Sequence, residues 1–356
     1  MSTPNTDSDD TLPVDLVRRH PTVTNPHIRM CAVITEVLRR WGSDGERVLR
    51  DAYRELGHRT GEYMIATGVV ARGADIETYG GVSEQIMDAC GLDGWRRIAS
   101  GPDEHRTAVP SCADYVAQYT AMNAPLNLCP IPFEWDNGCL DVINPELWIA
   151  PETCAYRGDS ECHYVIRNRV IRNRVIRESV IRESVIRASP AGVGVTPPVR
   201  TTSATALSDA PAWTNPQAGL LTILARSLAR LSPTPYPALL EAMRGSGAET
   251  GRYLLDGGLL PANAAPLQLA RTAAAIAEVS GYGDLTVTQT QDGARLVGTN
   301  PFTVVLDAFG FAGEVSNIVQ EWENRWVNAV NPAVRVLIEQ DGLNGGDRDQ
   351  RLFIFT

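Results

Sequence analysis

Apolar residues recur at helical spacing over the early part of the chain. The pattern predicts a helix that begins at His27 and a second helix from about Gly45 to Thr67, behind a capping pair at Ser43-Asp44. A third helix is predicted from Val82 to Cys90, where Gly91 ends it. This part of the chain is therefore predicted to form a layer of helices.

The pattern then changes from helical to strand-like. Val109–Tyr119 fits either a strand or a helix, whereas Phe133–Ile143 predicts three helical turns. Leu147–Tyr156 predicts a strand, and the turn formers of Arg157–Glu161 join it to a following strand. Within that turn Gly158 is free to take a positive φ, so the segment is predicted to be a β-hairpin.

The same order of elements occurs twice. Ala52–Tyr63 recurs as Ala242–Tyr253 with six of twelve positions identical, and the motif Glu134–Pro145 recurs in outline as Glu321–Pro332. Repeated motifs in the same order indicate an internal duplication. The predicted fold class is therefore α/β: two tandem copies of a helical layer packed on an antiparallel sheet, each ending in a C-terminal β-hairpin, in a pseudo-two-fold arrangement.

This duplication divides the chain into four parts. Residues 1–27 are expected to be a disordered leader, 28–167 the first copy, and 212–356 a second, degenerate copy. Residues 168–211 are expected to be a linker, because a Val-Ile-Arg motif repeats there with a five-residue period that builds no single apolar face. A basic interaction arm is the alternative reading of this repeat.

Composition narrows the functional classes. The chain has 356 residues and a net charge of -10, which argues against nucleic acid or an anionic membrane as the main partner. No apolar run approaches the ~20 residues that a membrane span needs, and no secretory signal is visible. An odd number of cysteines, seven, argues against a disulfide framework, so a cytoplasmic, reducing setting is expected. All 32 basic residues are arginine, which suggests a high-GC bacterial genome such as an actinobacterial one.

Candidate metal ligands gather around the first predicted hairpin. Alternation along a strand places Glu152 and Cys154 on one side, and Cys162 opens the second strand. If these strand faces meet, Cys129 could complete a set of four donors for zinc, which favours sulfur, nitrogen and oxygen ligands in a tetrahedron. The alternative is that these are reduced core cysteines.

The second copy offers an internal control. At the repeat offsets, the four candidate ligands fall on Ser316, Gln340, Gly342 and Gln350. The group changes together to polar or small residues, and apolar replacements would be expected if the cysteines served only packing. We interpret this concerted loss as a site that is used in one copy and vacated in the other.

Glu152, Cys154, Gly158-Asp159 and Cys162 resemble the closing signature of the 4-vinyl-reductase-type domain family, and Cys129 is similar to the family's earlier cysteine. The resemblance implies an α/β ligand-binding fold, usually paired two by two. It also implies, as in phenol-sensing bacterial activators, a zinc held by three cysteines and a glutamate beside a pocket for an aromatic ligand.

A second resemblance is to the L-2-amino-thiazoline-4-carboxylate hydrolase family, in which water opens a small heterocycle. The positions that carry this likeness are Gly57, Thr60, Gly61, Cys129, Pro130, Cys139, Asp141, Thr153, Gly158 and Cys162. It implies an enzyme in place of a binding module.

The first functional hypothesis is a cytoplasmic protein that binds a small apolar, aromatic or heterocyclic molecule next to zinc and serves a bacterial metabolic or biosynthetic pathway. Trp135, Trp148 and Tyr164 are candidate pocket walls, because large rings with a polar edge line many ligand sites. Their alternative role is ordinary core packing. Pairing is expected within the chain, with a homodimer as a further alternative.

The second hypothesis is a hydrolase or cyclase that acts on a small heterocyclic metabolite. Three protein ligands and an open position would let zinc acidify a water molecule. Glu134 or Asp141 could then act as general base, or Cys129 as nucleophile. A third hypothesis is a scaffold or chaperone whose degenerate copy is kept for pairing.

Overall fold

The computed structural model describes residues 26–169 and 217–356, apart from gaps at 90–91, 93, 111, 125–127, 129, 280–282, 300–315 and 341–347. Most of the expected leader and nearly all of the expected linker therefore lie outside the described residues. We refer to residues 28–167 as the first half and to residues 212–356 as the second half.

The first half begins with helices and ends in strands. Its elements are α3 (Pro26–Ala66), α4 (Ile76–Ala89), β1 (Arg96–Ser100), β2 (Glu104–Val109), α5 (Cys112–Ala121), α6 (Phe133–Ile143), β3 (Leu147–Thr153), the short 3-10 helix η1 (Ala155–Arg157) and β4 (Cys162–Asn168). The segment that fitted either strand or helix starts at the end of β2 and then becomes α5. The helix predicted over Phe133–Ile143 is confirmed.

The second half repeats this order among its described residues. Its elements are α9 (Gln217–Leu228), α10 (Tyr236–Asp256), α11 (Pro266–Val279), β5 (Gly283–Gln289), β6 (Gly293–Thr299), α13 (Ser316–Val330), β7 (Val334–Gln340) and β8 (Asp349–Phe355). The two parts of α3, which Gly42 separates with a non-helical φ of 51°, correspond to α9 and α10.

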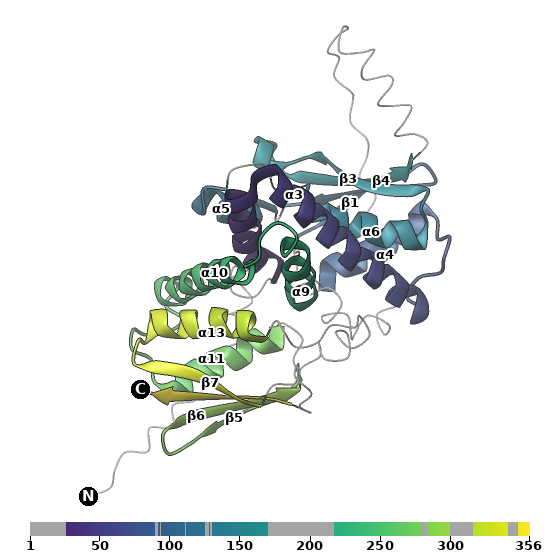
Figure 1. Cartoon of the computed structure of the whole chain (residues 1–356). Coiled ribbons are helices and arrows are strands. Elements are labelled where there is room, and N and C mark those ends of the chain that lie inside the picture. The colour runs from purple at the N-terminus through teal and green to yellow at the C-terminus, as the bar shows by residue number, and fades with distance from the viewer. Residues whose placement is uncertain are drawn as a thin grey trace, which may run out of the picture. The chain divides into compact units, whose positions relative to one another are not determined.

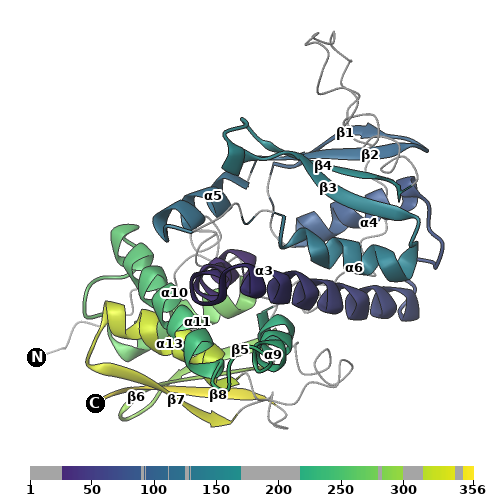
Figure 2. The same cartoon turned by 45° about the horizontal axis from the view of Figure 1, so that its top comes forward.

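Among the described residues, each half contains one four-stranded antiparallel sheet. The strand orders are β1-β2-β4-β3 and β5-β6-β8-β7, so the same connections are made twice. In the first half α4 and α6 lie against one face of the sheet, and α3 lies on the far side of these helices (Figure 2). In the second half α11 and α13 take the corresponding places, with α10 against α13 (Figure 1). The predicted α/β class with two similar halves is confirmed.

Strand pairing fixes which residues correspond between the halves. Leu147 pairs with Asn168 in the first sheet, and Val334 pairs with Phe355 in the second, so β3 and β4 match β7 and β8 at an offset of 187. His105 opposite Ile166 corresponds to Ala294 opposite Phe353, so β2 matches β6 at an offset of 189.

The boundaries of the two compact units of the chain differ from those of the two repeated halves. One unit spans Ile34–Pro235 and so includes α9, whereas the other combines Met1–Val33 with Tyr236–Thr356. Within the second of these units the Arg29 guanidinium lies over the Trp322 ring, 4.5 Å from its centre. No helix within the described residues combines the length and the apolar character that crossing a membrane requires.

Candidate functional site

Three cysteines from separate elements converge in the first half. Cys112 is the first residue of α5, Cys154 precedes η1, and Cys162 opens β4. Their side chains belong to one buried cluster, with exposed fractions of 6%, 1% and 1%. We call these three residues the thiol cluster. Two of them were predicted to come together from the sequence, and Cys112 was not.

Hydrogen bonds connect the thiol cluster. Cys112 Sγ lies 2.5 Å from the Tyr164 hydroxyl, and the Ala155 backbone N–H donates to Cys162 Sγ over 3.3 Å. Hydrogen bonding to Cys112, together with the Ala155 donor and against the effect of burial, lowers the pKa of Cys162 to about 6. The thiolate is the form of cysteine that binds soft metals and attacks electrophiles. Its surroundings therefore favour the thiolate form of Cys162 more than those of an ordinary cysteine do.

The hairpin turn holds two members of the cluster in place. Gly158 takes the left-handed conformation expected of it, with φ of 91°. The turn then brings the Asp159 carboxylate back to accept a hydrogen bond from the Cys154 backbone N–H at 2.7 Å. The Thr153 hydroxyl accepts from the His163 backbone N–H at 2.9 Å, which fixes β4 next to β3 beside Cys162.

The surroundings of the thiol cluster are apolar and aromatic. Partly buried side chains packed against it are Leu92, Trp95, Ala155, Tyr156 and Tyr164. The Tyr164 ring meets Phe133 edge-on with 4.5 Å between ring centres, and Tyr156 meets Tyr119 in a similar way at 6.1 Å. Aromatic rings packed beside sulfur atoms are the kind of side chains that contact a small molecule with an apolar or aromatic body.

Glu152 lies apart from the thiols because the strand is interrupted. A β-bulge occurs between Pro151 and Thr153, so Glu152 is an extra residue and the alternation of faces shifts. Its carboxylate forms ion pairs with Arg106 and Arg167, each at a shortest separation of 3.2 Å. The expectation that Glu152 shares a strand face with Cys154 is therefore wrong.

The second half repeats this ion pair. Glu339 occupies the same bulge of β7 as Glu152 does in β3, and Arg295 corresponds to Arg106. Arg295 Nε lies 2.6 Å from the Glu339 carboxylate. The earlier correspondence of Glu152 with Gln340 is thus wrong by one residue, and the glutamate is kept in the half that lacks the thiols. The glutamate–arginine ion pair is thus a feature of the sheet in each half.

The remaining candidate metal ligands can be placed only in part. The predicted donor Cys129 lies outside the described residues. Strand pairing matches Cys162 to Asp349, so the second half has a carboxylate where the first has a thiol. Among the described residues no three or more histidine, cysteine, aspartate or glutamate side chains are arranged as a metal site. Zinc therefore stays a prediction.

The candidate general bases Glu134 and Asp141 lie on α6 in a set of ion pairs with α3. Arg54 reaches both, at 2.9 Å and 2.6 Å, and His58 and Arg169 also contact Asp141. Burial raises the pKa of Asp141, but the hydrogen bonds from His58, Arg169 and Arg54 outweigh this and leave it below its ordinary value. A carboxylate stabilised in this way is a weak base.

The three candidate pocket rings do not share one surface. Tyr164 pairs with Pro151 and faces the helices, together with the thiol cluster. Trp148 pairs with Arg167, one position out of phase, so it lies on the opposite face of the sheet. Trp135 is 7% exposed and donates its ring N–H to the Thr60 hydroxyl at 3.3 Å. Only Tyr164 is placed at the thiol cluster.

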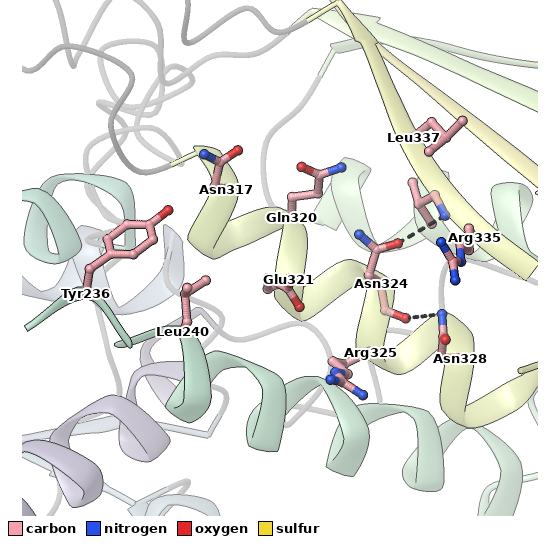
Figure 3. Close-up of a pocket in the computed structure, with 11 residues that line it drawn as sticks. Tyr236, Leu240, Asn317, Gln320, Glu321, Asn324, Arg325, Asn328, Arg335 and Leu337 are labelled. Atoms are coloured by element: carbon pink, nitrogen blue, oxygen red, sulfur yellow. Dashed lines mark hydrogen bonds between the residues drawn. The ribbon is translucent and has the colours of Figure 1, made fainter. Parts of the chain in front are cut away.

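A groove of about 690 Å³ lies in the second half between α10, α13 and β7. Figure 3 shows Tyr236 and Leu240 on one side and amide side chains of α13 along the floor. Two of these amides are already engaged: Asn324 accepts from the Val336 backbone N–H, and Asn328 donates to the Asn324 carbonyl. The groove therefore has a mixed polar and apolar lining, and Asn324 and Asn328 on its floor serve to hold β7.

Sequence reasoning missed two features of the first half. Cys112 lies in the segment whose secondary structure the pattern left open, so no spacing rule joined it to the hairpin. His105 showed no pattern in sequence, yet it is 2% exposed and lies 3.3 Å from Glu84 and 3.1 Å from Ser100. Both features depend on contacts between residues distant in the chain.

Comparison of the chain with family models, with curated proteins and with solved structures finds no match.

Proposed function

We propose that the first half binds a small apolar or aromatic molecule beside a zinc ion held by the thiol cluster. The observation that carries this proposal is the convergence of Cys112, Cys154 and Cys162 from three separate elements. Three thiols from separate elements meet here and are linked by hydrogen bonds, which is more than the packing of small apolar side chains requires. The second half contains no cysteine, and Asp349 stands there at the position of Cys162, which supports a role beyond folding.

The donor chemistry fits zinc. Thiolate sulfur is the preferred ligand of zinc in structural sites. Binding of zinc releases the thiol protons, so the metal takes the place of the S–H hydrogen bonds in the cluster. Cys129 is the candidate fourth donor, from the chain just before α6. Glu152 is left out of the proposed set because its carboxylate is engaged by two arginines. When bound, zinc would hold β3, β4 and α5 together at one point.

Metal content of the purified full-length protein tests this proposal. We expect one zinc per chain by elemental analysis, and its loss in Cys154→Ser and Cys162→Ser. Cys31→Ser and Cys139→Ser are matched controls, because both residues are buried cysteines outside the thiol cluster and should leave the zinc content unchanged. Cys129→Ser tests the fourth donor, and Cys112→Ser tests the residue that the structure adds.

A protein that contains no zinc after expression with zinc in the medium would contradict the proposal. So would a zinc content that falls equally in the cluster variants and in the two controls, since that would indicate general unfolding. Equal loss in Glu152→Gln would return the glutamate to the ligand set.

The ligand part of the proposal is tested separately with phenol as a minimal aromatic probe. Trp95 is packed against the thiol cluster, so its fluorescence should change on binding. The change should be saturable, absent in Trp95→Phe, and weakened by removing the ring in Tyr164→Leu. A fluorescence response that persists unchanged in Trp95→Phe would place the binding elsewhere.

A further inference from the structure

A buried polar network lies between α4 and the β1–β2 hairpin. Glu84 on α4 is 6% exposed and His105 on β2 is 2% exposed. Arg97 on β1 donates to both carboxylate oxygens of Glu84, with its Nε at 2.6 Å. The His105 ring lies between Glu84 and Ser100: its Nδ1 is in hydrogen-bond contact with Ser100 Oγ at 3.1 Å, and its buried Nε2 lies 3.3 Å from Glu84 Oε1 without the alignment of a hydrogen bond. We call these four residues the Glu84 network.

The second half builds the same interface without any of these groups. The pairing of β5 with β6 places Gln289 and Ala294 where Ser100 and His105 stand. It likewise places Val287 in the position of Arg97. The matched helices α4 and α11 put Ala274 at the position of Glu84. The fold thus closes this layer with Val287, Ala274 and Ala294 in place of the arginine, the glutamate and the histidine, and only the exposed position of Ser100 keeps a polar residue.

A glycine in α4 makes room for the histidine. A methyl group on Gly80 would lie 2.3 Å from His105 Nδ1, far inside van der Waals contact. In the second half Ala270 stands at the position of Gly80 and faces a strand that carries Ala294. The glycine and the imidazole therefore occur together, and the two alanines occur together. This is a matched pair of residues in each half.

Stability does not account for the Glu84 network. Burying a charged pair costs desolvation, and apolar replacement of such pairs is often neutral or stabilising. Here the replacement is present in the same chain. Burial raises the pKa of Glu84, but the hydrogen bonds from Arg97 and the proximity of the His105 ring more than offset this and hold the pKa below its ordinary value. The carboxylate thus stays ionised behind the imidazole.

We propose that Ser100 is a reactive nucleophile toward small acyl esters, with His105 as its general base and Glu84 as the residue that positions the imidazole. In space the contacts run from the serine to the histidine and from the histidine to the carboxylate, as in a catalytic triad. Such a triad is recognised by geometry and by the roles of its residues. Ser100 is exposed at the end of β1, so an ester can reach its hydroxyl, whereas the two supporting residues are buried.

Each step balances with water as the only co-reactant. Ser100 Oγ forms a bond to the acyl carbon while its proton passes to His105 Nδ1, and the alcohol leaves with that proton as the ester bond breaks. Water then attacks the acyl-serine, gives a proton to His105, and releases the acid while the serine hydroxyl regains the proton. The Nε2 side of the ring faces Glu84 throughout. The ring nitrogen used toward the serine is Nδ1, and either nitrogen of imidazole can carry the proton.

This site is independent of the thiol cluster. His105 and Val109 lie at opposite ends of β2, and Val109 is paired with Cys162. Four residues of strand separate the two sites by about 13 Å, at the usual rise of a β-strand. The proposal therefore stands or falls separately from zinc binding.

Labelling of the full-length protein with a fluorophosphonate probe tests the proposal. We expect covalent labelling at Ser100, identified by peptide mass spectrometry, and none at that peptide in Ser100→Ala. Ser160→Ala is the matched control, because Ser160 is exposed in the β3–β4 turn but has no histidine partner among the described contacts. With p-nitrophenyl acetate the same variants should show the same ranking of hydrolysis rates.

Two further variants separate chemistry from folding. His105→Gln should slow labelling by roughly 10²-fold or more, which is the usual contribution of a general base. Glu84→Gln should slow labelling less than His105→Gln does. Glu84→Asp keeps the carboxylate and should therefore retain most of the labelling rate of the parent protein. Ser100 lies at the surface, so Ser100→Ala gives a clear result even if the buried variants unfold. Labelling that does not occur at Ser100, or that occurs there no faster than at Ser160, would overturn the proposal.

Discussion

In the first half α4 meets its sheet through Glu84 and the imidazole of His105, whereas in the second half the matched positions on α11 and β6 are Ala274 and Ala294. The strand orders, the pairing and the bulge before the hairpin are the same in both halves. At the α11 interface the second half therefore shows that the fold closes the layer between helix and sheet without charged groups.

What the first half adds to this layer has to be explained by something other than folding. It adds the thiol cluster at one end of β2 and the Glu84 network at the other. Buried polar groups are costly unless they are paired, so they persist where they serve a use. This comparison is the reason for assigning both proposed activities to the first half, and it can be tested by changing matched residues in each half.

The largest expected effect concerns the buried charge of the second half. Glu323 and Arg351 form an ion pair at 2.7 Å, with side chains 9% and 14% exposed. Arg351→Leu would leave the carboxylate buried without this partner, which should cost about 3–5 kcal/mol in the free energy of unfolding. Urea denaturation measures it. The double variant Glu323→Leu with Arg351→Leu should be more stable than the single one, and the opposite ranking would contradict this reasoning.

The matched carboxyl of the first half should respond to pH. Asp136 corresponds to Glu323, and no ion pair to it is found within the described residues; burial raises its pKa from 3.8 to about 7. A raised pKa means that the folded state holds its proton longer than the unfolded one. Stability from this group is therefore complete below pH 4 and is lost as the pH rises to about 7, by up to about 4 kcal/mol.

Asp136→Asn removes this loss. The variant should be more stable than the parent protein in urea at pH 8 and similar to it at pH 4. The neighbouring Tyr79 and Cys139 have pKa values that burial raises well above their ordinary ones, so they stay neutral over this range. A parent and variant that differ equally at both pH values would show that Asp136 does not carry the effect.

The third prediction tests a feature that both halves share. A methyl group on Gly57 would lie 2.0 Å from the Trp135 carbonyl oxygen, and one on Gly247 would lie 2.3 Å from the Trp322 carbonyl oxygen. Gly57→Ala and Gly247→Ala should each cost about 2–3 kcal/mol, because backbone cannot move aside cheaply. Gly81→Ala is the control, since its methyl would meet nothing within 4 Å. Thermal unfolding of the three variants separates these outcomes.

Local patterns carried much of the fold prediction. The helix Phe133–Ile143, the hairpin with its left-handed Gly158 and the duplication were all visible, because each depends on periodicity or on a short motif. The bulge at Glu152 was not visible, because a single extra residue leaves composition unchanged while it shifts every later side chain to the other face. Strict alternation without this shift places Cys154 and Glu152 on the same face, which is why the prediction was wrong.

The contacts of the candidate site depended on the tertiary fold. Cys112 joins Cys154 and Cys162 only because β2 pairs with β4, which sequence spacing does not encode. His105 and Glu84 meet across helix and sheet, and the glycine that permits this has no signature of its own. Long-range pairing therefore had to be known before either group could be recognised.

The smallest expected effect is at the β-bulges that hold Glu152 and Glu339. It tests whether Glu152 is a zinc ligand or only part of the ion pair that both halves share. Glu152→Gln and Glu339→Gln should each change stability by less than about 1 kcal/mol, since partly exposed ion pairs contribute little. The two variants should behave alike, and neither should alter the zinc content. The pair Glu152–Arg106 has a matched counterpart, Glu339–Arg295, in the half without thiols. A loss of zinc in Glu152→Gln would therefore mean that two residues at matched positions in the two halves can have different roles. The same inference would then fail for the Glu84 network, where matched positions are the main argument.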